Sequence, residues 1–183
     1  MLSTYHTVVA VVGTNEKRKT LKTQSYIVSS SLSHSGSRIM LPRIRAVIVG
    51  IDNYPEPFSP LTSAVHDARK IANFLKEKFG AEEANIILLK DSDATKDQII
   101  ESISSLTRGA IRDDPFIFFF SGYAGKALPE GSEDGESSQV GIICPVDVSQ
   151  KGGISDKSLL QTFDQVAKLC GNNIVSTLGI RRS

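Results

Sequence analysis

The chain has 183 residues, which is enough for one compact domain with its own core and too few for two domains of ordinary size. Hydrophobic residues make up 40% and charged residues 22%, the balance of an ordinary water-soluble globular protein. The net charge of +1 argues against a nucleic-acid-binding surface, because such domains usually carry a strong basic excess. No run approaches the roughly 20 apolar residues that a membrane-spanning helix needs, so we expect neither nucleic acid nor membrane as a partner.

Residues 1–43 form a segment of distinct composition, rich in Ser and Thr, with six basic residues and Glu16 as the one acid. The segment has no sustained periodicity, which favours a disordered arm. A mitochondrial transit peptide stays open on composition, although no arginine-rich amphipathic helix is evident. A misplaced gene start would look the same. We expect a cytoplasmic protein, with mitochondrial targeting by this arm as the alternative.

Residues 44–183 form a second region, in which strands and helices alternate. The run Ala46–Gly50 is short, apolar and rich in β-branched residues, which predicts a buried parallel strand. Turn-forming residues follow over Asp52–Pro60. Apolar residues then recur at intervals of three and four over Leu61–Phe79, which predicts an amphipathic helix that ends at Gly80.

The same unit repeats further along the chain. Asn85–Leu89 reads as a second strand, and a capping-box signature at Thr95 opens a second helix. Phe116–Phe120 is apolar at every position, so we expect a third strand with both faces covered.

After a polar loop, Gln139–Ile143 is predicted to be extended, and Ser155 to cap a third helix that ends at Gly171. Asn173–Leu178 is the last predicted strand. This alternation of strand and helix predicts an α/β doubly wound fold, a mainly parallel sheet with helices on both faces.

Active sites of such sheets lie at the carboxyl ends of the strands, and the loops there carry two weak signals. The segment Gly122–Lys126 superficially looks like a phosphate-binding P-loop, but Phe120 and Ala127 stand where that motif needs a glycine and a hydroxyl residue. A phospho-receiver domain needs an acceptor aspartate where the third strand ends, and Ser121 stands there. Neither class of protein is supported.

A metal site is the next candidate, because carboxylates cluster in one loop. These are Glu130, Glu133, Asp134 and Glu136. Their spacing fits no calcium-binding loop, so a solvated acidic loop is favoured. We expect no metal and no cofactor.

Nucleophilic catalysis needs a thiol or hydroxyl beside a base. The two cysteines, Cys144 and Cys170, fit neither a disulfide framework nor a zinc site, and the compartment is expected to be reducing. Of the histidines, His6 and His34 lie in the N-terminal segment, and His66 lies within the first helix, where a surface or packing role is favoured. The residues alone reveal no enzyme constellation.

Seven short motifs follow one another in a characteristic order. They are Arg45–Tyr54, Leu61–Ala68, Asn85–Asp91, Ala94–Thr95, Phe118–Gly125, Ile143–Asp147 and Gly153–Asp156. In order and spacing they resemble the caspase/metacaspase-type cysteine peptidases, and most nearly the caspase-like proteins of fungi. The resemblance runs from about Arg45 to Leu178. It implies a caspase-like fold and cysteine-type endopeptidase activity, that is, proteolysis of the kind associated with programmed cell death.

The resemblance breaks at the catalytic residues. Tyr123 stands at the position of the family's histidine base, and an unperturbed tyrosine, with a pKa near 10, is a poor proton acceptor. Ala124 replaces the glycine whose N–H faces the oxyanion, and it keeps an N–H. Where the family has D-x-C-H-S-G, Gly179 takes the aspartate position and Arg181 the cysteine position. The resemblance therefore implies a chain without the catalytic dyad, which we expect to be inactive.

Compared with the family's domain, the sequence is expected to stop after about the fourth core strand. A short pseudopeptidase and a truncated or misread gene product both fit this ending, and the abrupt change over Gly179–Ser183 favours the second. We expect an unpaired apolar edge at the last strand, with self-association or pairing with caspase-like homologues through it. A non-catalytic regulatory module is the alternative function. Residual hydrolysis through Cys144 is a third, disfavoured hypothesis.

Overall fold

The computed structural model describes residues 6–12, 43–127 and 139–182, and within residues 6–12 and 180–182 it describes the backbone alone. The strands are β1 (His6–Val12), β2 (Arg45–Gly50), β3 (Ile86–Lys90), β4 (Phe116–Ala127), β5 (Val140–Ile143), β6 (Ile154–Ser155) and β7 (Ile174–Arg182). The helices are α1 (Ala64–Phe79), α2 (Lys96–Ser105), α3 (Val148–Lys151) and α4 (Asp156–Cys170), with 3-10 turns at Glu83–Asn85 and Asp91–Asp93.

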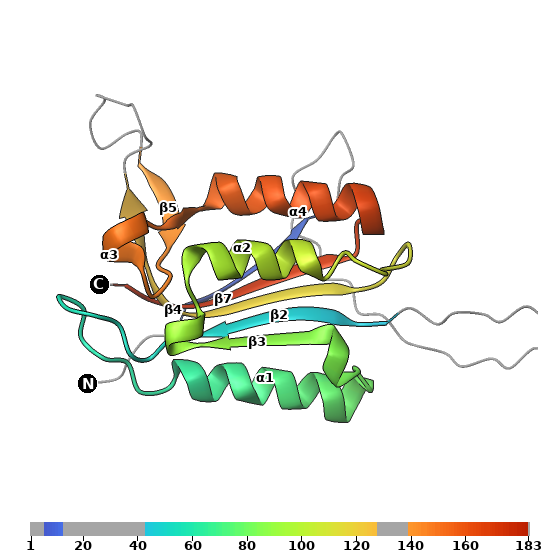
Figure 1. Ribbon diagram of the computed structural model, residues 1–183, viewed down its shortest axis with the longest axis horizontal. Coiled ribbons are helices and arrows are strands. Elements are labelled where there is room, and N and C mark those ends of the chain that lie inside the picture. Colours follow the sequence, from blue (N-terminus) through green and yellow to red (C-terminus); the bar gives the residue numbers. More distant parts are fainter. Residues whose placement is uncertain (1–5, 13–42, 128–138, 183) are drawn as a thin grey trace, which may run out of the picture.

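The strands form one seven-stranded sheet whose main path runs β1-β7-β4-β2-β3. Strands β3, β2, β4 and β7 are parallel, whereas β1 runs antiparallel to β7. Strand β5 pairs antiparallel with the far end of β4 and with β6. Helix α1 covers one face of the sheet, and α2 and α4 cover the other (Figure 1). The predicted α/β doubly wound class is confirmed.

Strand β4 divides the interior into two cores. Phe116, Phe118 and Phe120 lie in the core beneath α2 and α4, whereas Phe119 lies in the core beneath α1. This alternation follows from the strand period of two, and it explains why the run is apolar at every position. Burial of one phenylalanine side chain contributes about 2–3 kcal/mol, so β4 is a main source of stability.

The helix ends follow their local sequences. Thr95 Oγ1 accepts a hydrogen bond from Gln98 N (3.3 Å), and Ser155 Oγ accepts one from Ser158 N (3.1 Å), so both predicted caps are confirmed. Gly80, with a φ of 65°, ends α1 in the left-handed conformation that favours glycine. Within the described parts of the chain, no helix has both the length and the apolar character needed to cross a membrane.

A buried ion pair ties α2 to the sheet. Arg45, at the start of β2, is 5% exposed, and Asp114, just before β4, is 2% exposed. Arg45 Nε donates to Asp114 Oδ2 at 3.0 Å, and its other nitrogens donate to the carbonyl oxygens of Leu106, Arg108 and Gly109. Burial alone would raise the pKa of Asp114. The backbone N–H groups of Arg43 and Ile111 and the guanidinium of Arg45 together lower this pKa below its ordinary value.

Two sequence-based expectations differ from the structure. The segment 1–43 was expected to be an arm, yet its residues His6–Val12 form β1; the rest of the arm up to residue 42 lies outside the described residues. The last parallel strand was expected to have an unpaired edge, and this is wrong, because β1 pairs along β7 from Ile174 to Ile180. Its valine-rich sequence suits a strand, but the distant partner strand cannot be seen from local composition.

Candidate functional site

The candidate site lies where β4 and β7 end side by side. In the register of these two parallel strands, Tyr123 is opposite Arg181, and Ala124 is opposite Arg182. Adjacent strands lie about 4.8 Å apart. The fold therefore brings together the two positions at which the resemblance expects the histidine base and the cysteine nucleophile. The side chain of Arg181 lies outside the described part of the chain.

Tyr123 is held within a cluster of three aromatic rings. Its ring lies edge-on to that of Tyr54, with centroids 5.1 Å apart, and 5.4 Å from that of Phe58. Its hydroxyl donates to the carbonyl oxygen of Ser59 at 3.1 Å, and the residue is 8% exposed. The side chain of Tyr123 therefore holds the loop after β2 against β4.

Tyr54 is the polar centre of this cluster. Its hydroxyl accepts a hydrogen bond from Tyr123 N (3.1 Å) and donates one to the carbonyl oxygen of Cys144 (2.8 Å). Cys144 N in turn donates to the carbonyl oxygen of Tyr123 at 2.9 Å. Burial raises the pKa of Tyr54 well above its ordinary value, so the hydroxyl stays protonated. A Cβ on Gly122 would lie 2.5 Å from this hydroxyl, so a glycine at this position leaves room for the Tyr54 side chain.

The loop after β2 is fixed by two aspartates. Asp52 accepts hydrogen bonds from Ala64 N (2.8 Å) and Val65 N (3.2 Å), and so caps α1 from a distance. Asp91 Oδ1 accepts from the backbone N–H groups of Asp52 (2.8 Å) and of the residue that follows it. A Cβ on Gly50 would lie 2.6 Å from the carbonyl oxygen of Ala64, so glycine lets β2 end against this helix. Tyr54 is therefore presented by a rigid loop.

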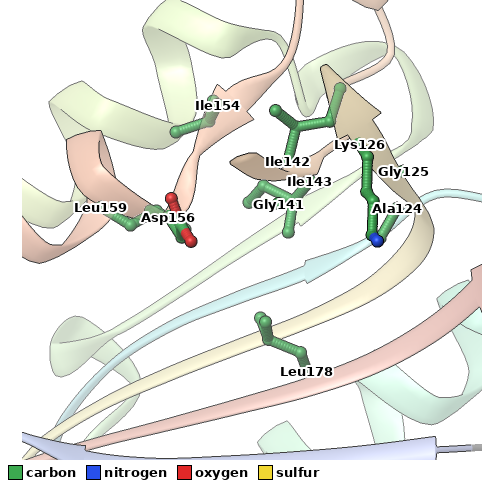
Figure 2. A pocket seen from close by; sticks show the side chains of 10 residues that line it. All are labelled: Ala124, Gly125, Lys126, Gly141, Ile142, Ile143, Ile154, Asp156, Leu159 and Leu178. Atoms are coloured by element: carbon green, nitrogen blue, oxygen red, sulfur yellow. The ribbon is translucent and has the colours of Figure 1, made fainter. Parts of the chain in front are cut away.

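Ala124 lies inside β4, between Ile143 of β5 and Arg182 of β7 in register. It is 8% exposed. Next to it is a cavity of about 400 Å³, lined by residues of the β4–β5 hairpin, β6, the first turn of α4 and β7 (Figure 2). The lining residues are Ala124, Gly125, Lys126, Gly141, Ile142, Ile143, Ile154, Asp156, Leu159 and Leu178. Its walls are mainly aliphatic, with one carboxylate and one amine.

Both cysteines lie in the interior of the protein. Cys144 and Cys170 are both buried and free, and burial raises the pKa of each thiol, which disfavours the reactive thiolate. His66 is exposed on α1, as expected for a surface residue, and the side chain of His6 and the whole of His34 lie outside the described parts.

No three metal-binding side chains come together within the described ranges. The acidic residues of the 128–138 loop, Glu130, Glu133, Asp134 and Glu136, fall outside those ranges. Phe58 and Ser59 carry no local signal of their role, because a loop rich in proline does not indicate ring packing. Tyr54 did carry a signal, since it ends the first motif of the resemblance.

The sheet is mainly parallel and covered by helices on both faces, and β4 and β7 end side by side at Tyr123 and Arg181. This arrangement defines a caspase-like fold. A family model described as "Metacaspase, peptidase C14 domain" matches residues 44–176. The chain belongs to this metacaspase family of peptidase C14 domains.

Two curated relatives illustrate the similarity. Metacaspase-1 of Meyerozyma guilliermondii is 34% identical over 125 residues, which cover 64% of this chain and 30% of the relative. Metacaspase-4 of Arabidopsis thaliana is 29% identical over 137 residues, covering 72% of this chain and 32% of the relative. The chain thus spans about a third of the length of these curated relatives.

A solved structure supports the fold. A protein of Geobacter sulfurreducens superposes with a TM-score of 0.60 at 16% sequence identity, and the match covers 77% of this chain and 50% of the other.

Proposed function

We propose that this chain is a catalytically silent metacaspase-family domain, a pseudopeptidase. The observation that carries the proposal is the register pair Tyr123–Arg181 at the ends of β4 and β7. Covalent peptide cleavage by this family needs a thiolate at one of these positions and a base at the other. A phenol and a guanidinium supply neither, because the guanidinium stays protonated and has no lone pair with which to attack.

The surroundings of Tyr123 support the same proposal. Its hydroxyl donates a hydrogen bond to the carbonyl oxygen of Ser59, and its ring packs against those of Tyr54 and Phe58. A general base must lie within hydrogen-bond reach of the proton that it takes, and this hydroxyl is instead directed at a carbonyl oxygen of the loop after β2. Tyr123 has a structural role, because its side chain joins β4 to the loop after β2.

A route through Cys144 is also disfavoured. The residue is 5% exposed, and burial raises the pKa of its thiol. Only the thiolate attacks a carbonyl, so the fraction of reactive sulfur at neutral pH falls as the pKa rises. No catalytic step is therefore assigned to it.

The test uses the purified full chain with peptide substrates cleaved after Arg, Lys or Asp, and a thiol-reactive active-site probe. An active metacaspase serves as the positive control, and the Cys144→Ala variant as the matched control. We expect turnover equal to the buffer blank, and no labelling of the native protein. Turnover or probe labelling that disappears in Cys144→Ala would contradict the proposal.

A second candidate function is a non-catalytic module that pairs with active caspase-like homologues. It is favoured by the sheet, whose described strand path ends in β3 on one side and β1 on the other. Backbone groups at such an edge can extend a partner's sheet. Co-purification with an active homologue, together with a change in that homologue's turnover, supports this role; a homologue that neither binds nor responds excludes it.

We also propose a cytoplasmic location, on the ground that both thiols are free in the structure, as is usual in a reducing compartment. Fractionation of cells that express the tagged full chain tests this. Recovery with mitochondria would favour the targeting alternative for the N-terminal segment.

A further inference from the structure

The outer edge of β7 has room for one pairing strand. Its inner side pairs in parallel with β4, and its outer side pairs antiparallel with β1. Seven register pairs run from His6–Ile180 to Val12–Ile174. Among the described residues, β1 forms a ladder with β7 alone.

The segment that fills this edge is suited to it by composition. Residues His6–Val12 read HTVVAVV, with four valines, one threonine and no Asp, Glu, Lys or Arg. β-Branched residues favour extended backbone, and an uncharged run offers no electrostatic penalty to pairing. The backbone N–H and C=O groups of β7 make the same antiparallel ladder with any strand of this kind.

The ladder does not depend on which molecule supplies the strand. Residues 13–44 connect β1 to β2, and a chain of that length reaches at most about 110 Å when fully extended. That reach exceeds the width of a domain of this size, so β1 of one molecule can lie on β7 of its neighbour. Exchange of an identical element between protomers costs little, because every contact of the closed form is made again.

We propose that the outer edge of β7 is a strand-accepting interaction surface, and that its partner is β1 of a second copy of this chain. At low concentration the chain's own β1 occupies the edge. At high concentration two molecules exchange β1 and form a closed dimer. The proposal is independent of whether the domain cleaves peptides, because it concerns backbone pairing on the far side of β7 from Tyr123.

A pair of engineered cysteines tests the register within one molecule. In a background carrying Cys144→Ala and Cys170→Ala, Val9→Cys is combined with Thr177→Cys, its register partner. Val9→Cys with Val175→Cys is the matched control, because Val175 is also half-buried and lies two residues out of register. Directly opposed residues come within disulfide range and diagonal neighbours do not, so we expect roughly tenfold more disulfide in the register pair.

Mixing two single-cysteine variants tests exchange between molecules. Neither Val9→Cys alone nor Thr177→Cys alone can close the 9–177 disulfide, so a crosslinked heterodimer in the mixture reports β1 of one copy on β7 of the other. Its yield should rise with protein concentration, and a mixture of Val9→Cys with Val175→Cys should give roughly a tenth as much.

The outcomes separate clearly. Crosslinking in both experiments, with a dimer by light scattering at high concentration, supports the proposal. A register disulfide in the double variant with no heterodimer in the mixture overturns exchange. Equal yields for Thr177→Cys and Val175→Cys overturn the strand-specific surface itself. Circular dichroism of each variant confirms that the fold is retained before crosslinking.

Discussion

Asp114→Asn removes the carboxylate that faces the guanidinium of Arg45 inside the protein. The two side chains are 0% and 6% exposed, and their atoms lie 3.0 Å apart, so the arginine is left buried without its counter-charge. Breaking a buried pair in this way costs about 3–5 kcal/mol, and the amide keeps one acceptor oxygen, so we expect about 3 kcal/mol. That is a large share of a stability of about 5–15 kcal/mol.

The measurement is equilibrium unfolding in urea, with an m value of about 2 kcal/mol/M, so the midpoint should fall by about 1.5 M. Glu83→Gln is the matched control, because it neutralises the carboxylate of the Lys76–Glu83 pair at 2.9 Å, whose side chains are 34% and 80% exposed. Exposed pairs contribute little, so this midpoint should change by less than about 0.3 M. Equal shifts in the two variants would refute the reasoning that burial makes the Arg45–Asp114 pair indispensable.

Three further tests concern the hydrogen bonds of Tyr54, the packing of Gly122 and the ion pair of Asp114. Tyr54→Phe leaves two buried backbone groups without a partner, which should cost about 2 kcal/mol and lower the midpoint of thermal unfolding by about 4–8 °C. Gly122→Ala should destabilise by about 1–3 kcal/mol, because its Cβ would lie 2.5 Å from the Tyr54 hydroxyl. Gly125→Ala, whose Cβ would meet no atom within 4 Å, should change the free energy of unfolding by less than about 0.5 kcal/mol, and similar losses for both glycines would contradict the packing argument. The pKa of Asp114 is lowered in the folded state, so its contribution to stability is complete above its unfolded pKa and is lost as the pH falls through the folded one; between about pH 5 and pH 3, Asp114→Asn should lose less stability than the parent, and parallel pH profiles would argue against this assignment.

Local signals in the sequence predict much of the core. The first half of β4 is apolar at every position, and only a strand covered on both faces explains such a run. The caps at Thr95 and Ser155 depend on residues three positions apart, so they too are visible locally. The second half of β4, Ser121–Ala127, was not predicted, because its glycine and polar residues look like a loop until β5 pairs with it.

Long-range partners are what local patterns do not contain. Arg45 was not predicted to be buried, since a charged residue is rarely found inside unless a partner such as Asp114 is present. The resemblance singled out Tyr123, but the hydrogen bond of its side chain to Ser59 depends on the path of a loop, which no local pattern contains. The ladder of β1 with β7 joins segments at opposite ends of the sequence, so composition alone suggested an arm.

Pairing of the first described strand with the last also orders events during synthesis. When β1 leaves the ribosome, β7 has not yet been translated, and the parallel core of β2, β3 and β4 can assemble while the valine-rich segment has no partner. Closing so long a loop comes late, because the loss of chain entropy precedes the gain from contacts. Until then the nascent chain exposes an uncharged segment with a strong tendency to form a strand. Chaperones can bind such a segment, and it can also pair wrongly with a neighbouring nascent chain.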